Sequence, residues 1–493
     1  MDESHNAPGT FQCEEKYQGD AQMFGHIIQG QENICDKDHP DMLYSKRLLH
    51  ELSSTVNPSA VLDGTELALA DQLSTFFPDL GRSRLPFNDS EINRISTLLQ
   101  QTNSSWSRVP RTYIVLRTID CLDLLGRLID LGFSDYWFPV TKECVPDCLP
   151  PKMRTRFMDA QELVLTKSLD LEKSEGGRHR HFKGDEPLPF DTKGVLGAGG
   201  SGQVDKVLST ISFREYARKR VPRKAALGGR GTKALTNIIN EIKVLKKLKH
   251  LHIVEFVGSY TDPKYLSVII SPVAEMDLSV YLNKSGTSQH AEIRTFFGCL
   301  ATALRFLHDH HIRHKDIKPG NILIDKGNIL FTDFGLALDS TDSSGSTTVG
   351  MVNGMTPRYC APEVALHEPR NTSSDIWSLG IIFLEMVVIL KYRTVEWIDE
   401  FFRAHGSQQL FVRSNSTGLE ELLAELKNTG SPSDNQLLVW VQQMLQEAHT
   451  SRPTAASLVT SITRAYGHGG SATVFCGLCC RVFRVSLGFS LGL

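Results

Sequence analysis

The most informative segment of the chain is His314-Lys315-Asp316-Ile317-Lys318-Pro319-Gly320-Asn321. Asp316 can orient an acceptor hydroxyl and accept its proton, and Lys318 can offset developing negative charge, as phosphoryl transfer from ATP requires. Asn321 offers an amide oxygen to a metal ion, and Asp333, in a Thr-Asp-Phe-Gly sequence, adds a metal-binding carboxylate. We therefore predict Asp316 and Lys318 as catalytic residues, and Asn321 and Asp333 as ligands of Mg²⁺.

The residues that follow this stretch predict a short β-hairpin. Ile322–Ile324 and Ile329–Phe331 are strand-like, and the four residues between them have the composition of a turn. Asn321 directly precedes the first strand and Asp333 follows the second. The hairpin would therefore bring the two metal-binding residues close together.

A glycine-rich segment lies further toward the N-terminus, with the sequence Leu196-Gly197-Ala198-Gly199-Gly200-Ser201-Gly202-Gln203-Val204. Its G-x-G-x-x-G spacing alone also serves dinucleotide-binding folds, in which a helix follows the glycines. Here Val204–Leu208 continues as a strand, which favours a hairpin that folds over ATP phosphates, because backbone without Cβ atoms can approach them closely. The nucleotide-binding residues predicted here are Leu196, Gly197, Gly199, Gly202 and Val204.

Tyr216-Ala217-Arg218-Lys219 resembles the V-A-I-K strand of protein kinases, in which the lysine contacts the α- and β-phosphates and pairs with a carboxylate on the next helix. Glu241, in a run with helical apolar spacing, is a suitable carboxylate. Each residue alone would be expected at the surface. Their order and context instead predict that Ala217, Lys219 and Glu241 belong to the nucleotide site.

Three later features complete the pattern. Met355–Glu363 looks like a peptide-positioning loop that ends in Ala-Pro-Glu, and Asp375–Gly380 resembles a hydrophobic helix that anchors a catalytic loop. Arg452 resembles the arginine that pairs with a buried Glu363, since an unpaired buried charge is costly. All these elements in this order resemble the eukaryotic protein kinase family, over about residues 188–466.

The resemblance implies an α+β, bilobal protein-kinase fold, with a small sheet-rich N-lobe to about Ser271, a larger helical C-lobe, and ATP between them. Pro272 has no backbone N–H, so the adenine would find its donor at Val273. Lys318-Pro319 together with Thr356 resembles serine/threonine kinases. The kinase domain with its helical N-terminal region also looks like a group of fungal serine/threonine kinases.

A catalytically silent pseudokinase that serves as a scaffold is the alternative. Loss of catalysis usually shows as substitution of key residues, yet Lys219, Asp316, Asn321 and Asp333 are all present. Three departures from the family remain, and one is an insertion at Pro222–Lys233 that predicts a solvated loop. Lys315 replaces the arginine that many kinases have before the catalytic aspartate, and Arg218 replaces an apolar residue and would point away from Lys219 on a strand.

The chain before the kinase-like domain divides into three predicted parts. Residues 1–40 are acidic and polar, which predicts disorder. Residues 41–170 have apolar positions at helical spacing, as in Ile114–Leu131, and predict a mostly helical region that is either structural or binds a protein partner. Residues 171–187 are charged and contain glycine, which is typical of a linker.

The tail, residues 467–493, contains a cysteine cluster at Cys476, Cys479 and Cys480, followed by Arg481 and Arg484. Acylation of these cysteines together with the arginines would give peripheral membrane attachment. A disordered or docked tail with unmodified thiols is the alternative. The sequence shows no cysteine and histidine set with zinc-finger spacing.

Bulk composition narrows the functional class. The chain has 493 residues and a formal net charge of −3, which gives no attraction to nucleic acid. We find no secretory signal peptide, and no apolar stretch reaches the roughly 18–20 residues that span a bilayer. These observations predict a cytoplasmic or otherwise intracellular protein. The resemblance to serine/threonine kinases implies ATP and Mg²⁺ as cofactors and a protein substrate that carries serine or threonine.

Overall fold

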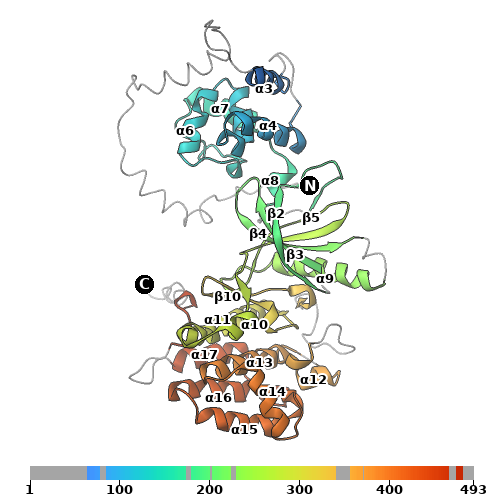
Figure 1. The fold of residues 1–493 in the computed structure, drawn as a ribbon, viewed down its shortest axis with the longest axis vertical. Helices are drawn as coiled ribbons and strands as arrows, with labels where there is room; N and C mark the ends of the chain where they lie inside the picture. The colour runs from blue at the N-terminus through green and yellow to red at the C-terminus, as the bar shows by residue number, and fades with distance from the viewer. Residues whose placement is uncertain are drawn as a thin grey trace, which may run out of the picture.

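The computed structural model describes residues 64–77, 85–173, 179–199, 202–223, 229–339, 356–369, 371–465 and 474–480. The predicted disordered segment 1–40 lies outside the described residues, as do the first residues of the predicted helical region. A helical N-terminal region lies at one end of the molecule, a β-sheet lies in the middle, and a larger helical lobe lies at the other end (Figure 1). The predicted α+β bilobal fold, preceded by a helical region, is confirmed.

The N-terminal region has its own apolar core. Its helices are α3 (Gly64–Ser74), α4 (Asp89–Thr102), α5 (Pro110–Thr118), α6 (Leu125–Asp130), α7 (Pro151–Ala160) and α8 (Lys167–Asp170). A capping box starts α4, where Asn88 Oδ1 accepts from the Glu91 N–H and the Glu91 carboxylate accepts from the Asn88 N–H. Residues at helical spacing form the buried core, among them Ile95, Ile114, Leu125 and Phe157.

The N-lobe is a six-stranded sheet with the order β1-β5-β6-β4-β3-β2. Its strands are β1 (Arg180–His181), β2 (Phe190–Gly199), β3 (Gly202–Ser209), β4 (Glu215–Pro222), β5 (Glu255–Thr261) and β6 (Tyr265–Ser271). Neighbouring strands are antiparallel, except that β1 runs parallel to β5. Helix α9 (Gly229–Leu245) packs against the sheet, and Ile238 and Val244 contribute buried side chains there.

The prediction of a linker at 171–187 is wrong for the described part of this segment. Arg180 and His181 pair with β5 as strand β1, and the Phe182 N–H donates to the Thr261 carbonyl at 2.8 Å. Leu171 and Phe182 are buried in an apolar cluster of the N-lobe, which explains why this charged segment is held in place. The described residues on both sides of positions 174–178 thus pack on the N-lobe.

A buried carboxylate strengthens this junction. Glu172 accepts hydrogen bonds from the Ser209 hydroxyl on β3 and from the Tyr216 hydroxyl on β4, the latter at 3.0 Å. Burial, followed by the charge of Glu172, raises the pKa of Tyr216 above its ordinary value. Ile211, in the β3–β4 turn, packs into the apolar core of the helical region. The two units therefore share both polar and apolar contacts.

The C-lobe consists of helices and a few short strands. The helices are α10 (Leu278–Lys284), α11 (His290–Asp309), α12 (Pro362–Ala365), α13 (Ser373–Leu390), α14 (Val395–Ala404), α15 (Ser416–Lys427), α16 (Asn435–Met444) and α17 (Ala455–Ala465). The strands are β7 (Met276–Asp277), β8 (Ile312–Arg313), β9 (Ile322–Asp325), β10 (Asn328–Phe331) and β11 (Leu338–Asp339). Strands β9 and β10 form the predicted hairpin, and positive φ at Lys326 and Gly327 matches a tight two-residue turn.

Helix α13 is the central helix of the C-lobe. Among the described residues, its length and apolar composition alone would allow it to cross a membrane, but 89% of it is buried inside the protein. Asp375 and Glu385 on this helix are buried and bound by cations or N–H groups of the same lobe. These features are those of a core helix in a globular domain.

Part of the predicted tail is packed on the C-lobe. The Gly298 N–H of α11 donates to the Phe475 carbonyl at 2.7 Å, and the Phe475 ring packs edge-on against Trp440. A 3₁₀ turn, η13 (Leu478–Cys480), follows and contacts α11. Residues 474–480 therefore belong to the folded domain.

Candidate active site

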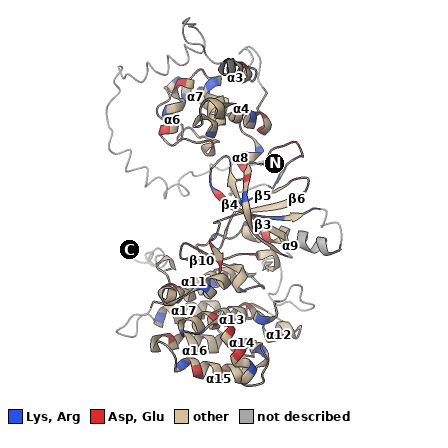
Figure 2. Cartoon of the chain, viewed as in Figure 1, with Lys and Arg blue, Asp and Glu red and all other residues tan. Residues whose placement is uncertain are grey.

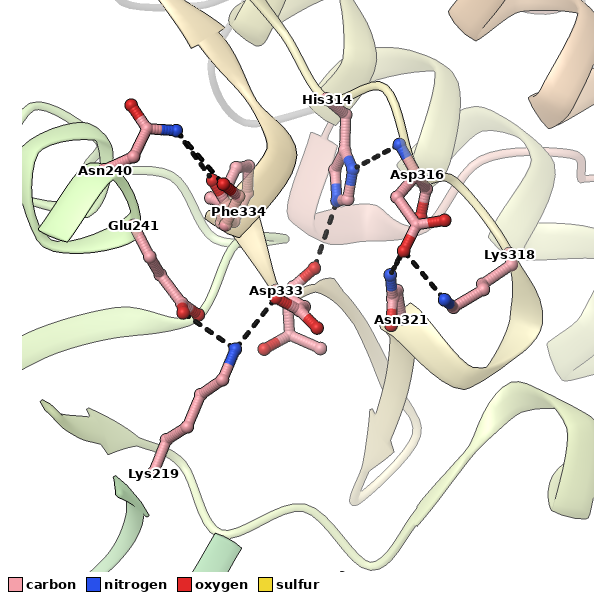
Figure 3. A network of polar contacts seen from close by, with 11 residues as sticks. Lys219, Asn240, Glu241, His314, Asp316, Lys318, Asn321, Asp333 and Phe334 are labelled. Atoms are coloured by element: carbon pink, nitrogen blue, oxygen red, sulfur yellow. Dashed lines mark hydrogen bonds and ion pairs between the residues drawn. The ribbon is translucent and has the colours of Figure 1, made fainter. Parts of the chain in front are cut away.

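The loop between β8 and β9 holds Asp316 in a defined orientation. Lys318 Nζ lies 2.7 Å from Asp316 Oδ2. The Asn321 amide nitrogen donates to the same carboxylate oxygen at 2.9 Å and to the Asp316 carbonyl at 2.8 Å (Figure 3). The structure thus brings together three of the residues predicted from this loop.

Helix α13 holds the backbone of this loop through its Asp375 side chain. The Asp375 carboxylate accepts from the N–H groups of His314 and Lys315, both at 2.9 Å, and lies 3.2 Å from His308 Nε2. Burial would raise the pKa of Asp375, but the hydrogen bonds from His308 and the loop hold it below its ordinary value. His314 Nε2 also lies 3.0 Å from the Thr332 carbonyl, which ties the loop to the residue before Asp333.

Lys219 joins the two lobes. Its Nζ lies 2.7 Å from Glu241 Oε2 on α9 and 2.8 Å from Asp333 Oδ1, which follows β10 (Figure 3). Burial would lower the pKa of Lys219, but the two carboxylates raise it above its ordinary value, and Lys219 in turn lowers the pKa of Asp333 despite burial. The ammonium group therefore stays charged where the N-lobe and the C-lobe meet.

Asn240 provides a second connection between α9 and the segment after Asp333. Its amide nitrogen donates to the Ala337 carbonyl at 2.7 Å and to the Gly335 carbonyl at 3.3 Å. Asp333 itself has a left-handed backbone with φ of 59°, and Phe334 after it is fully buried. The position of α9 is thus coupled to the orientation of the Asp333 carboxylate.

The predicted nucleotide-binding residues of the N-lobe lie on β2, β3, β4 and the segment after β6. Gly199 pairs with Gly202 at the end of the β2–β3 hairpin, and Val204 pairs with Lys219 across β3 and β4. Gly202 has φ of +121°, and a Cβ there would lie 2.5 Å from the Arg220 carbonyl oxygen, so the position requires glycine.

The other predicted residues of this group differ in exposure. Leu196 is about half exposed, Ala217 is buried in the main core beside β6, and Val273 is partly buried two residues after β6 ends. A Cβ added at Gly197 would meet no atom within 4 Å, so the space beside this residue is open. All are located on the N-lobe or at its junction with the C-lobe.

Arg218 behaves as its place on a strand predicts. It points away from Lys219 and forms a buried ion pair with Asp205 at 3.1 Å, with a hydrogen bond to the Thr192 hydroxyl at 2.9 Å. Further along the chain, Arg452 forms the expected bidentate ion pair with Glu363, with N···O distances of 2.7 and 2.9 Å. Both pairs are structural supports around the site.

Sequence reasoning left Thr356, His314, Asp375 and Asn240 out of the predicted site residues. The Thr356 hydroxyl donates to Asp316 Oδ1 at 3.0 Å, so it contacts the predicted catalytic carboxylate directly. Thr356 and Asp375 lie in motifs that the sequence displays, and these motifs were sufficient signals. Asn240 directly precedes Glu241, but its role depends on the three-dimensional packing of α9.

The donor set fits a hard divalent cation. Asp333 brings a carboxylate, and Asn321 uses its amide nitrogen toward Asp316, so its oxygen is the atom that can ligate a cation. Carboxylate and amide oxygens are the ligands that Mg²⁺ prefers. The geometry therefore supports metal-assisted phosphoryl transfer.

Comparisons with known proteins agree with this geometry. The family model described as "Protein kinase domain" matches residues 190–462, which is more than half of the chain. The chain belongs to the protein kinase family. The kinase domain is therefore the unit that holds all the residues predicted for the site.

Similar curated proteins carry serine/threonine kinase or kinase kinase kinase names. "Serine/threonine-protein kinase fused" of Drosophila melanogaster is 32% identical over 224 residues, which is 42% of this chain and 27% of the relative. "Serine/threonine-protein kinase 36" of Mus musculus is 33% identical over 195 residues, which is 39% of this chain and 14% of the relative. "Mitogen-activated protein kinase kinase kinase 2" of Arabidopsis thaliana is 30% identical over 314 residues, or 63% of this chain and 46% of the relative.

The chain thus spans less than half the length of these curated relatives. They come from an insect, a mammal and a plant, so the narrower resemblance to fungal kinases stays a prediction. Kinase family membership implies ATP and a divalent metal as cofactors and a protein as substrate.

Proposed function

We propose that this protein is an active serine/threonine kinase that uses ATP and Mg²⁺. One observation carries the proposal: Lys219 lies between Glu241 and Asp333, while Asp316, Lys318 and Asn321 form a single network. An active kinase requires both arrangements at once, because the first positions phosphates and metal and the second positions the acceptor.

The residues divide the reaction between them. Asp316 orients the acceptor hydroxyl and takes its proton as the hydroxyl oxygen bonds to the γ-phosphorus, while the bond from phosphorus to the bridging oxygen of ADP breaks. Lys318, 2.7 Å from Asp316, offsets the charge on the transferring group. Lys219 holds the α- and β-phosphates. Mg²⁺ held by Asp333 and Asn321 would neutralise phosphate charge.

Serine and threonine are the proposed acceptors. Thr356 and Lys318 both contact the Asp316 carboxylate, so they limit the space and the charge around the acceptor oxygen. The names of two relatives, kinase fused and kinase 36, specify the same class. Basic and acidic residues are interspersed along the described elements (Figure 2), which supports a protein substrate rather than nucleic acid.

The test is incubation of the full chain with γ-labelled ATP, Mg²⁺ and a generic basic protein, followed by phosphoamino-acid analysis. We expect phosphoserine and phosphothreonine, and no transfer by the Asp316→Asn variant, whose carboxamide cannot take the proton. Label on tyrosine alone would contradict the substrate class. Absence of transfer by a folded wild-type chain that binds ATP would instead establish the pseudokinase alternative.

We further propose that the helical region 41–170 binds a protein partner and that the protein works inside the cell. Helices α3 to α7 lie beyond the N-lobe sheet, on the side away from the C-lobe (Figure 1), where a partner can reach them. ATP as phosphate donor and the absence of disulfides among the described cysteines support the location. Retention of a partner by the full chain, and its loss from a chain that begins at residue 167, would support the binding role.

A further inference from the structure

Four side chains of the types that can ligate a metal ion come together from three distant segments of the chain. His252 lies in the connection between α9 and β5, Cys299 lies on α11, and Cys479 and Cys480 lie in η13. Their ligand atoms all lie within 4.8 Å of one another. Sequence spacing did not predict this set, because His252 and Cys480 are 228 residues apart.

The sulfur–sulfur distances from Cys299 are close to the edges of a tetrahedron around one metal ion, and the nitrogen–sulfur distances are somewhat shorter. Cys299 Sγ lies 3.7 Å from Cys479 Sγ and 3.9 Å from Cys480 Sγ. His252 Nε2 lies 3.1 Å from Cys480 Sγ and 3.3 Å from Cys479 Sγ. Zinc bonds of about 2.3 Å to sulfur and about 2.05 Å to nitrogen give edges of about 3.8 and 3.6 Å in a regular tetrahedron.

The same distances exclude a disulfide between Cys299 and either Cys479 or Cys480. A disulfide places its sulfur atoms about 2.05 Å apart. The Cys299 sulfur lies well beyond that distance from both tail sulfurs, at 3.7 and 3.9 Å. The three cysteines are thiols, and thiolate sulfur is the ligand that zinc favours at structural sites.

His252 is held as a metal-binding histidine usually is. Its side chain is almost completely buried, and Nδ1 lies 2.8 Å from the Ile329 carbonyl of β10. A carbonyl only accepts, so Nδ1 carries the proton and Nε2 presents its lone pair to the sulfurs. This arrangement fixes the ring before a metal binds.

We propose that His252, Cys299, Cys479 and Cys480 bind one Zn²⁺ in a closed, four-coordinate structural site. Binding would release the three thiol protons and replace contacts between sulfur atoms with metal bonds. Four protein ligands leave no open position, so the site would stabilise the fold and would not take part in phosphoryl transfer.

The site would link the tail segment 474–480 to the β9–β10 hairpin that precedes Asp333. The His252 carbonyl accepts from the Phe331 N–H at 2.9 Å, and the Phe331 carbonyl accepts from the Val254 N–H at 3.1 Å. Phe331 precedes Asp333 by two residues. One metal ion would therefore connect η13, α11, the end of the α9 connection and β10.

The experiment measures metal in the full chain purified without chelator. Inductively coupled plasma mass spectrometry should find about one zinc per chain, and the Cys479→Ser/Cys480→Ser double variant should lose it. The matched control is Cys144→Ser, at an exposed cysteine of the helical region, which should retain the zinc. Chelation should lower the melting temperature of the wild type by several degrees and leave that of the double variant unchanged.

A second measurement covers the case in which the double variant fails to fold. Co²⁺ added to the metal-free wild-type chain should produce the absorption bands of tetrahedral cobalt with thiolate ligands, and His252→Gln should shift them. A metal-free chain that takes up neither Zn²⁺ nor Co²⁺ would overturn the proposal. A fatty acyl group or a disulfide found on Cys479 or Cys480 in the purified chain would overturn it as well. None of these readouts depends on kinase activity.

Discussion

The Nζ atom of Lys219 lies 2.7 Å from Oε2 of Glu241, although the lysine is only 8% exposed and the glutamate 2%. Removal of one partner of a buried ion pair leaves the other charge buried alone, at a cost of about 3–5 kcal/mol. Loss of one partner should therefore affect stability as well as the position of the phosphates, and variants can separate the two effects.

Replacement of Lys219 by methionine should reduce phosphate transfer by at least about 100-fold, since the α- and β-phosphates lose their cation. It should also lower the free energy of unfolding by about 3 kcal/mol, because Glu241 keeps a buried charge. Turnover assays and urea denaturation measure the two effects. The Lys219→Met/Glu241→Gln double variant should regain most of the stability and none of the activity. A double variant as unstable as the single one would contradict the assignment of the stability loss to Glu241.

Asp333 and Asp316 should have separable roles in ATP binding. Asp333→Asn should weaken ATP binding in the presence of Mg²⁺ and have little effect in its absence, because the carboxylate acts through the metal. Asp316→Asn should bind ATP nearly as the wild type does and should fail to transfer phosphate. Titration calorimetry with and without Mg²⁺ distinguishes the two variants. Equal loss of ATP binding in both would contradict the division of roles.

The bidentate Arg452–Glu363 ion pair predicts that a substitution far from the reacting atoms will strongly affect stability. Arg452→Ala should destabilise the C-lobe by about 3–5 kcal/mol, since Glu363 is buried and loses a bidentate partner. Chemical denaturation measures the change. The exposed Arg464 on α17 offers a matched control, and Arg464→Ala should change the free energy of unfolding by less than about 0.5 kcal/mol.

Acid should destabilise the N-lobe through His179. Burial, followed by the charges of His181 and Lys246, lowers its pKa from 6.5 to about 4. Between these two pH values, the His179 side chain is protonated in the unfolded chain and neutral in the folded chain. The free energy of unfolding should therefore fall as the pH drops from 6.5 toward 4. His179→Asn should make this decline shallower, whereas His367→Asn, at an exposed histidine, should not. Denaturation curves at a series of pH values provide the comparison.

Much of the active site could be predicted from sequence because its residues lie in short runs with fixed spacing. Asp316, Lys318 and Asn321 share one loop, and a two-residue turn brings Asp333 back beside them. Lys219 and Glu241 are farther apart, but the strand and helix periodicity around them indicated their elements. Local spacing therefore carried most of the information about this site.

Two features escaped the same reasoning for physical reasons. Strand β1 has only two residues, Arg180 and His181, and neither favours a strand, so its position depends on the β5 backbone and on burial of Phe182. The proposed zinc ligands come from segments that only tertiary packing brings together, and the short spacing within the tail includes just Cys479 and Cys480 of the set. Neither feature leaves a local pattern.

Strand β1 also has a practical consequence for work with shorter fragments. It occupies the outer edge of β5, and an unpaired strand edge is a template for association with other chains. A fragment cut at residue 188, where the sequence suggests that the domain begins, would uncover that edge together with the apolar surface under Leu171 and Phe182. Such a fragment should self-associate in proportion to its concentration, whereas one that starts at residue 167 should remain monomeric in sedimentation analysis. The aggregation behaviour of this kinase domain would then be decided by residues that precede its catalytic motifs.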